Sequence, residues 1–208
     1  MKTWERYREL LPYGDWHVHS NYVDGKSSID EMCRQALNNG LRLVAFTEHV
    51  RKELTYNYDD FIKEIKEARQ KYPELKILYG CEAKILEGGE LDASRDVLDK
   101  CEFVVAVFHT LPYQSKEDNI NALREALSNP RVESWGHPGT LLNKYDFEPE
   151  EMEELVRLCI RNNVLIENNL KEKYTPPQEF SRIVEKLGAA TVFGSDAHHT
   201  SELRKLSK

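Results

Sequence analysis

Short apolar runs alternate with amphipathic stretches along most of this 208-residue chain. Each run is rich in Val, Ile, Leu and aromatic residues, and most lack a regular polar alternation. Such runs suit strands that are buried on both faces of a parallel sheet. We therefore expect seven strands, at residues 15–19, 41–46, 76–81, 103–107, 132–135, 164–166 and 191–193.

Helix signals separate most of these strands. Ser28-Ile29-Asp30-Glu31 is a capping box, and Gly40 stands at a usual stop position after the helix it begins. Apolar positions with helical spacing predict four further helices, around 61–68, 120–127, 149–159 and 180–187. Seven βα units of roughly 30 residues each fill the chain, so we predict one α/β domain, a closed barrel. An open doubly wound sheet is the alternative, weakened because no Gly-rich phosphate loop follows the first strand.

The histidines share one location in this scheme: all seven lie at or just beyond the C-terminal end of a predicted strand. They are His17, His19, His49, His109, His137, His198 and His199. Closed α/β barrels carry their active sites at this end, and residues two apart on a strand, such as His17 and His19, share a face. Unrelated structural histidines would also fall on helices, so the pattern predicts a metal site, with imidazole and carboxylate ligands suited to Zn, Mn or Fe.

Charge and composition exclude several classes of protein. The net charge of −7 argues against electrostatic binding of long nucleic acid over a broad surface. A small phosphorylated ligand remains possible, because a bound metal ion can make the local electrostatic potential positive. No apolar run is long enough to span a membrane, and the first residues do not read as a signal peptide. The four cysteines are scattered without a CxxC pair, which excludes a zinc finger and favours reduced thiols in a cytoplasmic protein.

Taken together, seven short motifs resemble those of the PHP family, which is named for its polymerase and histidinol phosphatase members. They occur in the family's order between residues 15 and 198: Asp15-Trp16-His17-Val18-His19-Ser20 with Asp24-Gly25, Thr47-Glu48-His49, Gly80-Cys81-Glu82-Ala83, Phe108-His109, Gly136-His137-Pro138, Ile166-Glu167-Asn168-Asn169 and Gly194-Ser195-Asp196-Ala197-His198. The resemblance implies a single PHP-type domain over residues 1–208, folded as a distorted TIM-like (β/α)7 barrel.

The resemblance also implies two or three divalent metal ions, and it assigns their ligands. The first metal takes His17, His19, Glu82 and Asp196. Glu82 bridges to a second metal bound by His109 and His137, and a third takes Asp24, His49 and His198. Some family members have histidine where this chain has Asp24, and an acidic ligand favours a harder cation, so the metal can be Zn, Mn or Fe.

A site of this kind predicts a phosphoesterase. We expect a metal-bound hydroxide to hydrolyse a small phosphomonoester, as in histidinol phosphatases. The expected catalytic residues are Asp24, Glu82, Asp196 and Arg51. The expected substrate-binding residues are Arg51, Lys84, Asn168 and His199. Arg51 has an alternative as an exposed residue, and Asn168 as one that orients a metal ligand.

Three other functions remain open at this point. One is a metallohydrolase of C–N bonds, although such enzymes often use a bridging carbamylated lysine where this chain offers Glu82. Another is a phosphodiesterase or 3'-5' exonuclease that acts on short nucleotides, since nothing here suggests a groove for a long strand. The third is a metal-binding module without catalytic activity.

Overall fold

Seven parallel strands follow one another around the molecule in chain order. The computed structural model describes residues 1–206, and each strand pairs with the next one along the chain. The strands are β1 (Gly14–Val18), β2 (Leu43–His49), β3 (Lys76–Lys84), β4 (Phe103–Val107), β5 (Ser134–Gly136), β6 (Leu165–Asn169) and β7 (Thr191–Gly194). All seven predicted strands are present. The sequential order confirms the (β/α)7 TIM-like barrel and excludes the doubly wound sheet, whose strand order reverses.

A seam between the last strand and the first closes the barrel. Val18 and Ala197 form a parallel bridge beyond the end of β7. The His19 amide donates to the Ala197 carbonyl at 2.8 Å, and the Asp196 amide donates to the His17 carbonyl at 2.8 Å. Predicted ligands from opposite ends of the sequence are therefore joined through their backbones.

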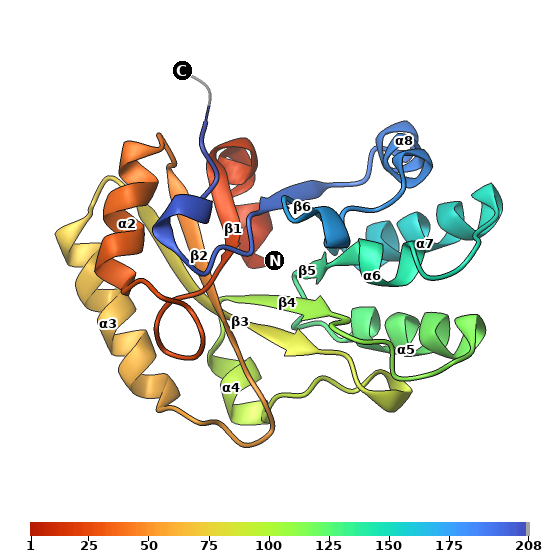
Figure 1. The fold of residues 1–208 in the computed structure, drawn as a ribbon, viewed down its shortest axis with the longest axis horizontal. Helices are drawn as coiled ribbons and strands as arrows, with labels where there is room; N and C mark the ends of the chain where they lie inside the picture. The colour runs from red at the N-terminus through yellow and green to blue at the C-terminus, as the bar shows by residue number, and fades with distance from the viewer. Residues whose placement is uncertain (207–208) are drawn as a thin grey trace.

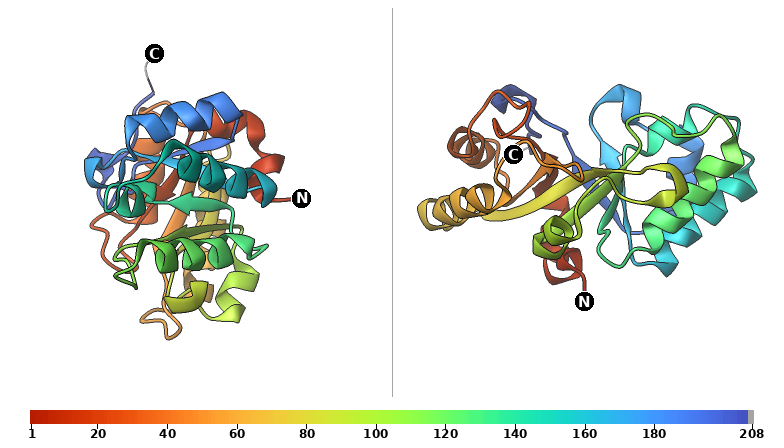
Figure 2. Two further views of the ribbon diagram at one scale, coloured as in Figure 1. Left: turned by 90° about the vertical axis from the view of Figure 1, so that its right-hand side faces the viewer. Right: turned by 90° about the horizontal axis from the view of Figure 1, so that it is seen from below.

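Helices cover the outside of the barrel. They are α1 (Thr3–Arg6), α2 (Ile29–Asn38), α3 (Tyr58–Lys71), α4 (Arg95–Lys100), α5 (Lys116–Ser128), α6 (Pro138–Leu142), α7 (Pro149–Arg161) and α8 (Gln178–Leu187). In Figure 1, α2 and α3 lie on one side of the strands, and α5, α7 and α8 on the other. Figure 2 shows α8, α7 and α5 one above another. Within residues 1–206, no helix is long and apolar enough to cross a membrane.

The core has two parts, divided by the sheet. The barrel interior is filled by side chains such as Trp16, Leu43, Phe103 and Leu165, while a larger cluster packs between strands and helices. The ring of Trp4 joins the interior cluster from the N-terminal segment. The interior is therefore packed, and the histidine-bearing end of the strands is left for a site.

The N-terminal segment is fixed at the opposite end of the barrel, just before β5. The Glu133 carboxylate accepts hydrogen bonds from the amides of Thr3, at 2.9 Å, and Trp4, at 3.1 Å. The indole N–H of Trp4 donates to the Asn163 carbonyl at 3.0 Å. Glu133 is thus a buried carboxylate with a structural role, far along the strands from the histidines.

A β-bulge in β1 changes the direction in which its side chains point. Asp15 pairs with Val44 and Val18 with Phe46, so β1 has one residue more than β2 over this interval. Such a bulge breaks the strict alternation of faces. Trp16 can therefore enter the barrel interior while the next residue, His17, also points toward the site.

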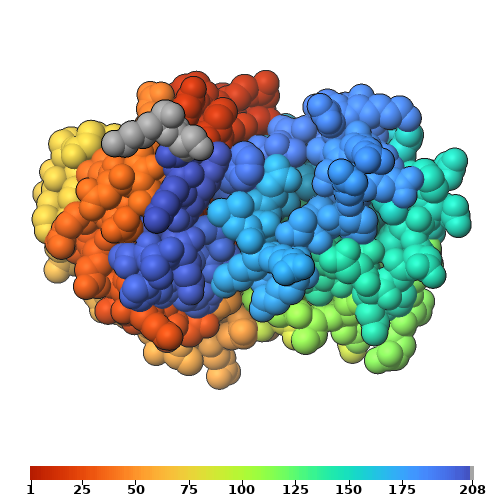
Figure 3. Space-filling model, turned by 45° about the horizontal axis from the view of Figure 1, so that its top comes forward, coloured from red at the N-terminus to blue at the C-terminus, as the bar shows by residue number. Residues whose placement is uncertain are grey.

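The last described segment packs on the first third of the chain. Figure 3 shows this dark blue segment beside the red and orange residues. The amide of Lys26 donates to the His198 carbonyl at 2.6 Å, and the Asn39 side chain donates to the carbonyls of Leu203 and Arg204. These contacts hold the segment after β7 against the loop that follows β1 and against the end of α2.

Candidate metal centre

Glu82 lies at the centre of the histidine cluster. It belongs to β3 and is completely buried. Its carboxylate oxygens lie 2.7–3.5 Å from nitrogens of five imidazole rings, those of His17, His19, His49, His109 and His137. These rings come from β1, β2, β4 and β5 or the turns after them, so four of the other six strands direct histidines to one carboxylate.

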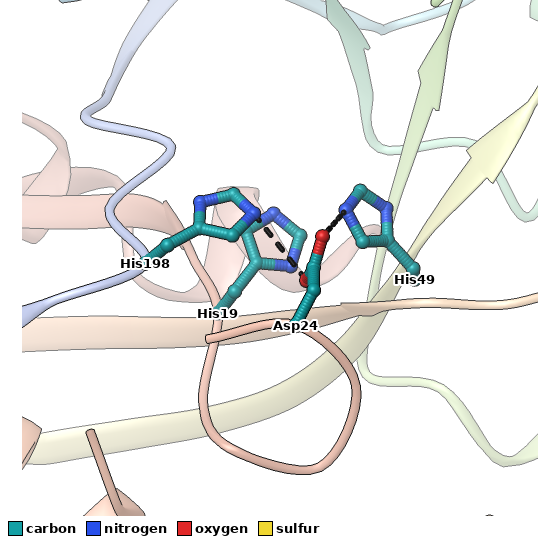
Figure 4. Close-up of side chains that lie close together, drawn as sticks. All are labelled: His19, Asp24, His49 and His198. Carbon is teal, nitrogen blue, oxygen red and sulfur yellow. Dashed lines mark ion pairs between the residues drawn. The ribbon is translucent and has the colours of Figure 1, made fainter. Parts of the chain in front are cut away.

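A second group surrounds Asp24, in the loop after β1. Figure 4 shows its carboxylate between the rings of His49 and His198, with His19 behind. Its oxygens lie 3.4 Å from His49 Nε2 and 3.4 Å from His198 Nε2. Asp24 is the most exposed member, with 52% of its side chain accessible, so this part of the cluster faces solvent.

Asp196 completes the cluster from the turn after β7. Its Oδ1 lies 3.2 Å from His19 Nε2, and its Oδ2 lies 3.5 Å from His137 Nε2. The ammonium group of Lys171 lies 3.0 Å from Asp196 Oδ2. A cation from the loop after β6 therefore also enters the site.

The nine side chains assigned as ligands all meet here, in four overlapping groups whose ligand atoms lie within 4.8 Å of one another. The groups are His17, His19 and Asp196; His17, Glu82 and His137; His49, Glu82 and His109; and His19, Asp24, His49 and His198. These groups differ from the expected ligand sets at two residues. His19, expected at the first metal, also belongs to the Asp24 group, and His49, expected at the third metal, also belongs to a group with Glu82. The division of these ligands among individual ions thus stays a prediction.

The backbone is held in an unusual conformation at two of these residues. His137 has a φ of 51° and Asp196 a φ of 52°, both in the left-handed region that non-glycine residues seldom occupy. Such conformations cost about 1–3 kcal/mol each and cluster at functional sites. The conformation that points these two side chains into the cluster therefore lowers the stability of the fold.

Glu167, on β6, orients two of the histidines from behind. Its Oε1 accepts from His17 Nδ1 at 2.6 Å, and its Oε2 accepts from the His137 amide at 2.8 Å. Asn169 donates to the same Oε2 at 3.1 Å. A hydrogen bond at Nδ1 fixes the tautomer that leaves Nε2 free for a metal. A Cβ on Gly194 would lie 2.3 Å from Glu167 Oε1, so only glycine leaves room for this carboxylate.

Burial and neighbouring charges set the protonation states. Burial lowers the pKa of His19 to about 3, so this ring is neutral and able to coordinate. Burial alone would raise the pKa of Glu82, but His17 and His137 hold it well below its usual value. Burial alone would lower the pKa of His17, but Glu167 and Glu82 raise it well above its usual value. A metal ion must therefore displace a proton from His17.

The unpaired atoms of the cluster fit divalent cations. Among the described residues, buried atoms without a hydrogen-bond partner include His17 Nε2, both ring nitrogens of His19, both oxygens of Glu82, and both ring nitrogens of His137. Buried polar groups are normally hydrogen-bonded, and each unpaired one needs an explanation. Imidazoles gathered around carboxylates are the ligand set of Zn, Mn and Fe sites, which supplies that explanation.

The sequence of this chain matches a known protein family. The PHP domain family matches residues 15–171. The chain belongs to the PHP family. A probable phosphatase of Acetivibrio thermocellus is 30% identical over 207 residues, which cover 93% of this chain and 83% of that protein.

A longer relative of this PHP chain carries a nuclease activity in its name. The DNA polymerase/3'-5' exonuclease PolX of Bacillus subtilis is 29% identical over 198 residues. The match covers 91% of this chain but 35% of PolX, so the PHP chain spans about a third of that relative.

Two solved structures share the PHP fold. A putative histidinol phosphatase of Listeria monocytogenes superposes with a TM-score of 0.73 at 17% identity, over 91% of this chain and 97% of that one. Histidinol phosphate phosphatase of Lactococcus lactis, solved with zinc, L-histidinol and phosphate, has a TM-score of 0.68 at 20% identity, over 90% and 87% of the two chains. At these identities the likeness shows the fold alone.

Two of the four expected substrate-binding residues of this PHP domain lie beside the cluster. Arg51 and Lys84 line a groove of about 490 Å³ together with Asp24, His49 and His109. Arg51 is half-exposed, and its Nε lies 3.5 Å from Asp92 Oδ2. Both cations can therefore reach a ligand that extends from the metal centre.

The other two expected residues lie elsewhere. Asn168 alternates with Glu167 on β6 and lines a separate cavity against α8, with Phe180 and Val184. His199 is exposed, and its ring accepts from the amide of Ser201 at 3.2 Å at the start of a short 3-10 helix. The structure thus does not bring these two side chains to the groove.

Three contributors were not singled out from the sequence of this PHP chain. Glu167 was noted only within a motif, although a carboxylate inside a buried strand needs a charged or hydrogen-bonding partner. Glu48 is also fully buried, and it accepts from the Ser20 amide at 2.7 Å and the Ser20 hydroxyl at 2.6 Å. These bonds hold the start of the loop that carries Asp24. Tyr174 stacks on His137, with ring centres 3.5 Å apart, and no sequence signal pointed to that contact.

Proposed function

We propose that this PHP domain is a metal-dependent phosphoesterase that hydrolyses a small phosphomonoester. The observation that carries the proposal is the buried Glu82 carboxylate within 3.5 Å of five imidazole rings. Membership of the PHP family and the similarity to proteins named as probable phosphatases support ester hydrolysis. The structural likeness to a histidinol phosphate phosphatase supports a small substrate.

The chemistry divides between the bound ions and the side chains of this chain. Divalent cations in this cluster would lower the pKa of a water molecule and neutralise charge on a phosphoryl group. Glu82, Asp196 and Asp24 would hold those cations together with the histidines. Glu167 keeps His17 in the tautomer that can coordinate, through the 2.6 Å hydrogen bond at Nδ1.

The groove beside the cluster suits the alcohol part of the substrate. Its volume of about 490 Å³ fits a small molecule, and its walls combine Leu54 and Tyr56 with the cations of Arg51 and Lys84. Arg51 can bind a phosphoryl oxygen or another anionic group with two N–H donors. We assign Arg51 and Lys84 to substrate binding, and the identity of the alcohol stays open.

The test is a metal analysis of the purified protein together with a substrate panel. The panel compares a monoester and a diester of one chromogenic alcohol with an amide and a lactone. We expect turnover of the monoester that a chelator abolishes and that added Mn²⁺ or Zn²⁺ restores. Activity that survives both chelation and the His109→Ala substitution would refute the metal mechanism.

A matched pair of variants separates the site from the fold. Glu82→Gln and Glu133→Gln make the same chemical change to buried carboxylates at opposite ends of the barrel. Glu82→Gln should lose bound metal and turnover, whereas Glu133→Gln should keep both. Equal loss in the two variants would mean that the effect is a general loss of folding.

Nuclease-like activity is the second candidate, favoured by the 29% identity with PolX over 91% of this chain. The net charge of −7 limits such a substrate to short nucleotides. Faster turnover of the diester than of the monoester in the same panel would favour this second function.

A further inference from the structure

A lysine reaches the metal centre from the loop after β6. The Lys171 ammonium group lies 3.0 Å from Asp196 Oδ2 and 3.4 Å from His198 Nδ1. Within residues 1–206, it is the only lysine or arginine that forms an ion pair with any of the nine expected metal ligands. Its side chain is 32% exposed, so it borders both the cluster and solvent.

Hydrogen bonds fix the backbone of Lys171 to the same strand that orients the histidines. Its amide donates to Asn169 Oδ1 at 2.8 Å, and its carbonyl accepts from the Tyr174 amide at 2.9 Å. Asn169 in turn donates to Glu167, which holds His17 and His137. The base of the lysine is therefore positioned with the metal ligands, while its four-carbon stem leaves the ammonium group free to move.

The charges around Lys171 change when the cluster is filled. Divalent cations that bind Asp196 compete with the ammonium group for the same carboxylate oxygens. Two such cations would bring four positive charges, enough to offset the four carboxylates of Glu82, Asp24, Asp196 and Glu167 around the cluster. Once a cation occupies the Asp196 carboxylate, the ammonium group of Lys171 is left to pair with an anion that binds beside the ions.

We infer that Lys171 binds the phosphoryl group of the substrate and, after hydrolysis, the released phosphate. This inference rests on the proposed function. Lys171 supplies a charged N–H donor from the β6 side, whereas Arg51 and Lys84 lie along the groove that receives the alcohol. Lys171 is thus a substrate-binding residue that acts on the part common to all phosphomonoesters.

The experiment measures phosphate binding directly. Wild type, Lys171→Met, Lys171→Arg and the control Lys173→Met are loaded to the metal content of the wild type and titrated calorimetrically with inorganic phosphate. Lys173 belongs to the same loop, but its ammonium group lies over the Tyr174 ring, 4.3 Å from the ring centre. Lys171→Met removes the charge while it keeps a similar length.

We expect Lys171→Met to weaken phosphate binding by about 10- to 100-fold, the range for loss of a charged hydrogen bond. The KM for the chromogenic monoester should rise by a similar factor, with Lys171→Arg close to wild type and Lys173→Met unchanged. Before loading, the metal content of the purified proteins should be equal in all four. Unchanged phosphate binding in Lys171→Met refutes the inference. A second result would also refute it: Lys171→Met loses metal, and added metal restores both its metal content and its phosphate binding. Lys171 would then only position Asp196.

The outcomes for the two proposals are separable. Wild-type protein that binds phosphate through Lys171 but turns over no monoester contradicts the proposed function alone. Wild-type protein that hydrolyses the monoester, while Lys171→Met binds phosphate normally, contradicts the role of Lys171 alone.

Discussion

The Glu167→Gln substitution should weaken metal binding without disturbing the fold. Glu167 uses Oε1 to accept from His17 Nδ1 at 2.6 Å, and Oε2 to accept from the His137 amide at 2.8 Å and from Asn169 at 3.1 Å. An amide replaces one of these oxygens with a donor. Either the NH₂ group faces the two N–H groups of His137 and Asn169, or it faces His17.

Both orientations damage the site. Toward His137 and Asn169, the NH₂ group leaves three donors without an acceptor. Toward His17, it turns Nδ1 into an acceptor and moves the proton to Nε2, the nitrogen that must bind the metal. Loss of such an outer partner typically costs 10- to 100-fold in metal affinity, which corresponds to about 1.4–2.7 kcal/mol.

Competition with a chelating dye at constant pH measures this change, and urea unfolding checks the fold. The control is Glu133→Gln, which places the same amide at a buried carboxylate that accepts from two backbone amides at the other end of the barrel. We expect weaker metal binding in Glu167→Gln alone. Metal affinity within about twofold of wild type in a folded Glu167→Gln protein would refute the tautomer argument.

Three further predictions concern other parts of the site. Arg51→Ala should raise the KM for a phosphomonoester about 10-fold and change kcat little, because one charged contact is lost; an unchanged KM would make Arg51 a surface residue. Metal affinity of the metal-free protein should increase as pH rises from about 5 to 9, because His17, whose pKa is raised, must lose its proton before it binds; a flat profile contradicts this. Gly25→Ala should weaken metal binding at Asp24 by about 10-fold. A Cβ at residue 25 would lie 2.3 Å from the Ser20 carbonyl oxygen, so the loop that carries Asp24 must move. A variant that still binds its full metal content at limiting metal concentration would contradict this prediction.

Most of the architecture could be predicted because its signals are local. The strands are continuous apolar runs, and the helix that begins after Ser28 carries its own capping box, which the structure confirms with an N-cap bond from the Glu31 amide. Three short helices were not predicted: Thr3–Arg6, Arg95–Lys100 and Pro138–Leu142. None exceeds six residues, so none is long enough to show an apolar period.

Individual contacts of the site were harder to predict than its location. The ends of parallel strands meet at one edge, so the meeting of nine expected ligands follows from the strand positions. The side-chain assignments on β6 depend instead on which face each residue takes. Asn168 was expected at the substrate, whereas Glu167 and Asn169 face the cluster. The pairing of Lys171 with Asp196 depends on a loop conformation, which no local pattern specifies.

The seam between β1 and β7 has a consequence for the order of events during synthesis. His17 and His19 leave the ribosome about 180 residues before Asp196 and His198, and at typical elongation rates that interval lasts roughly 10–40 s. During that time the first histidines have no complete partner set, and the barrel edge at β1 stays open. A metal ion that uses the ligands expected from both strands would bind with full affinity only after residue 198 has been synthesised, so metal binding would follow pairing of the β7 and β1 ends.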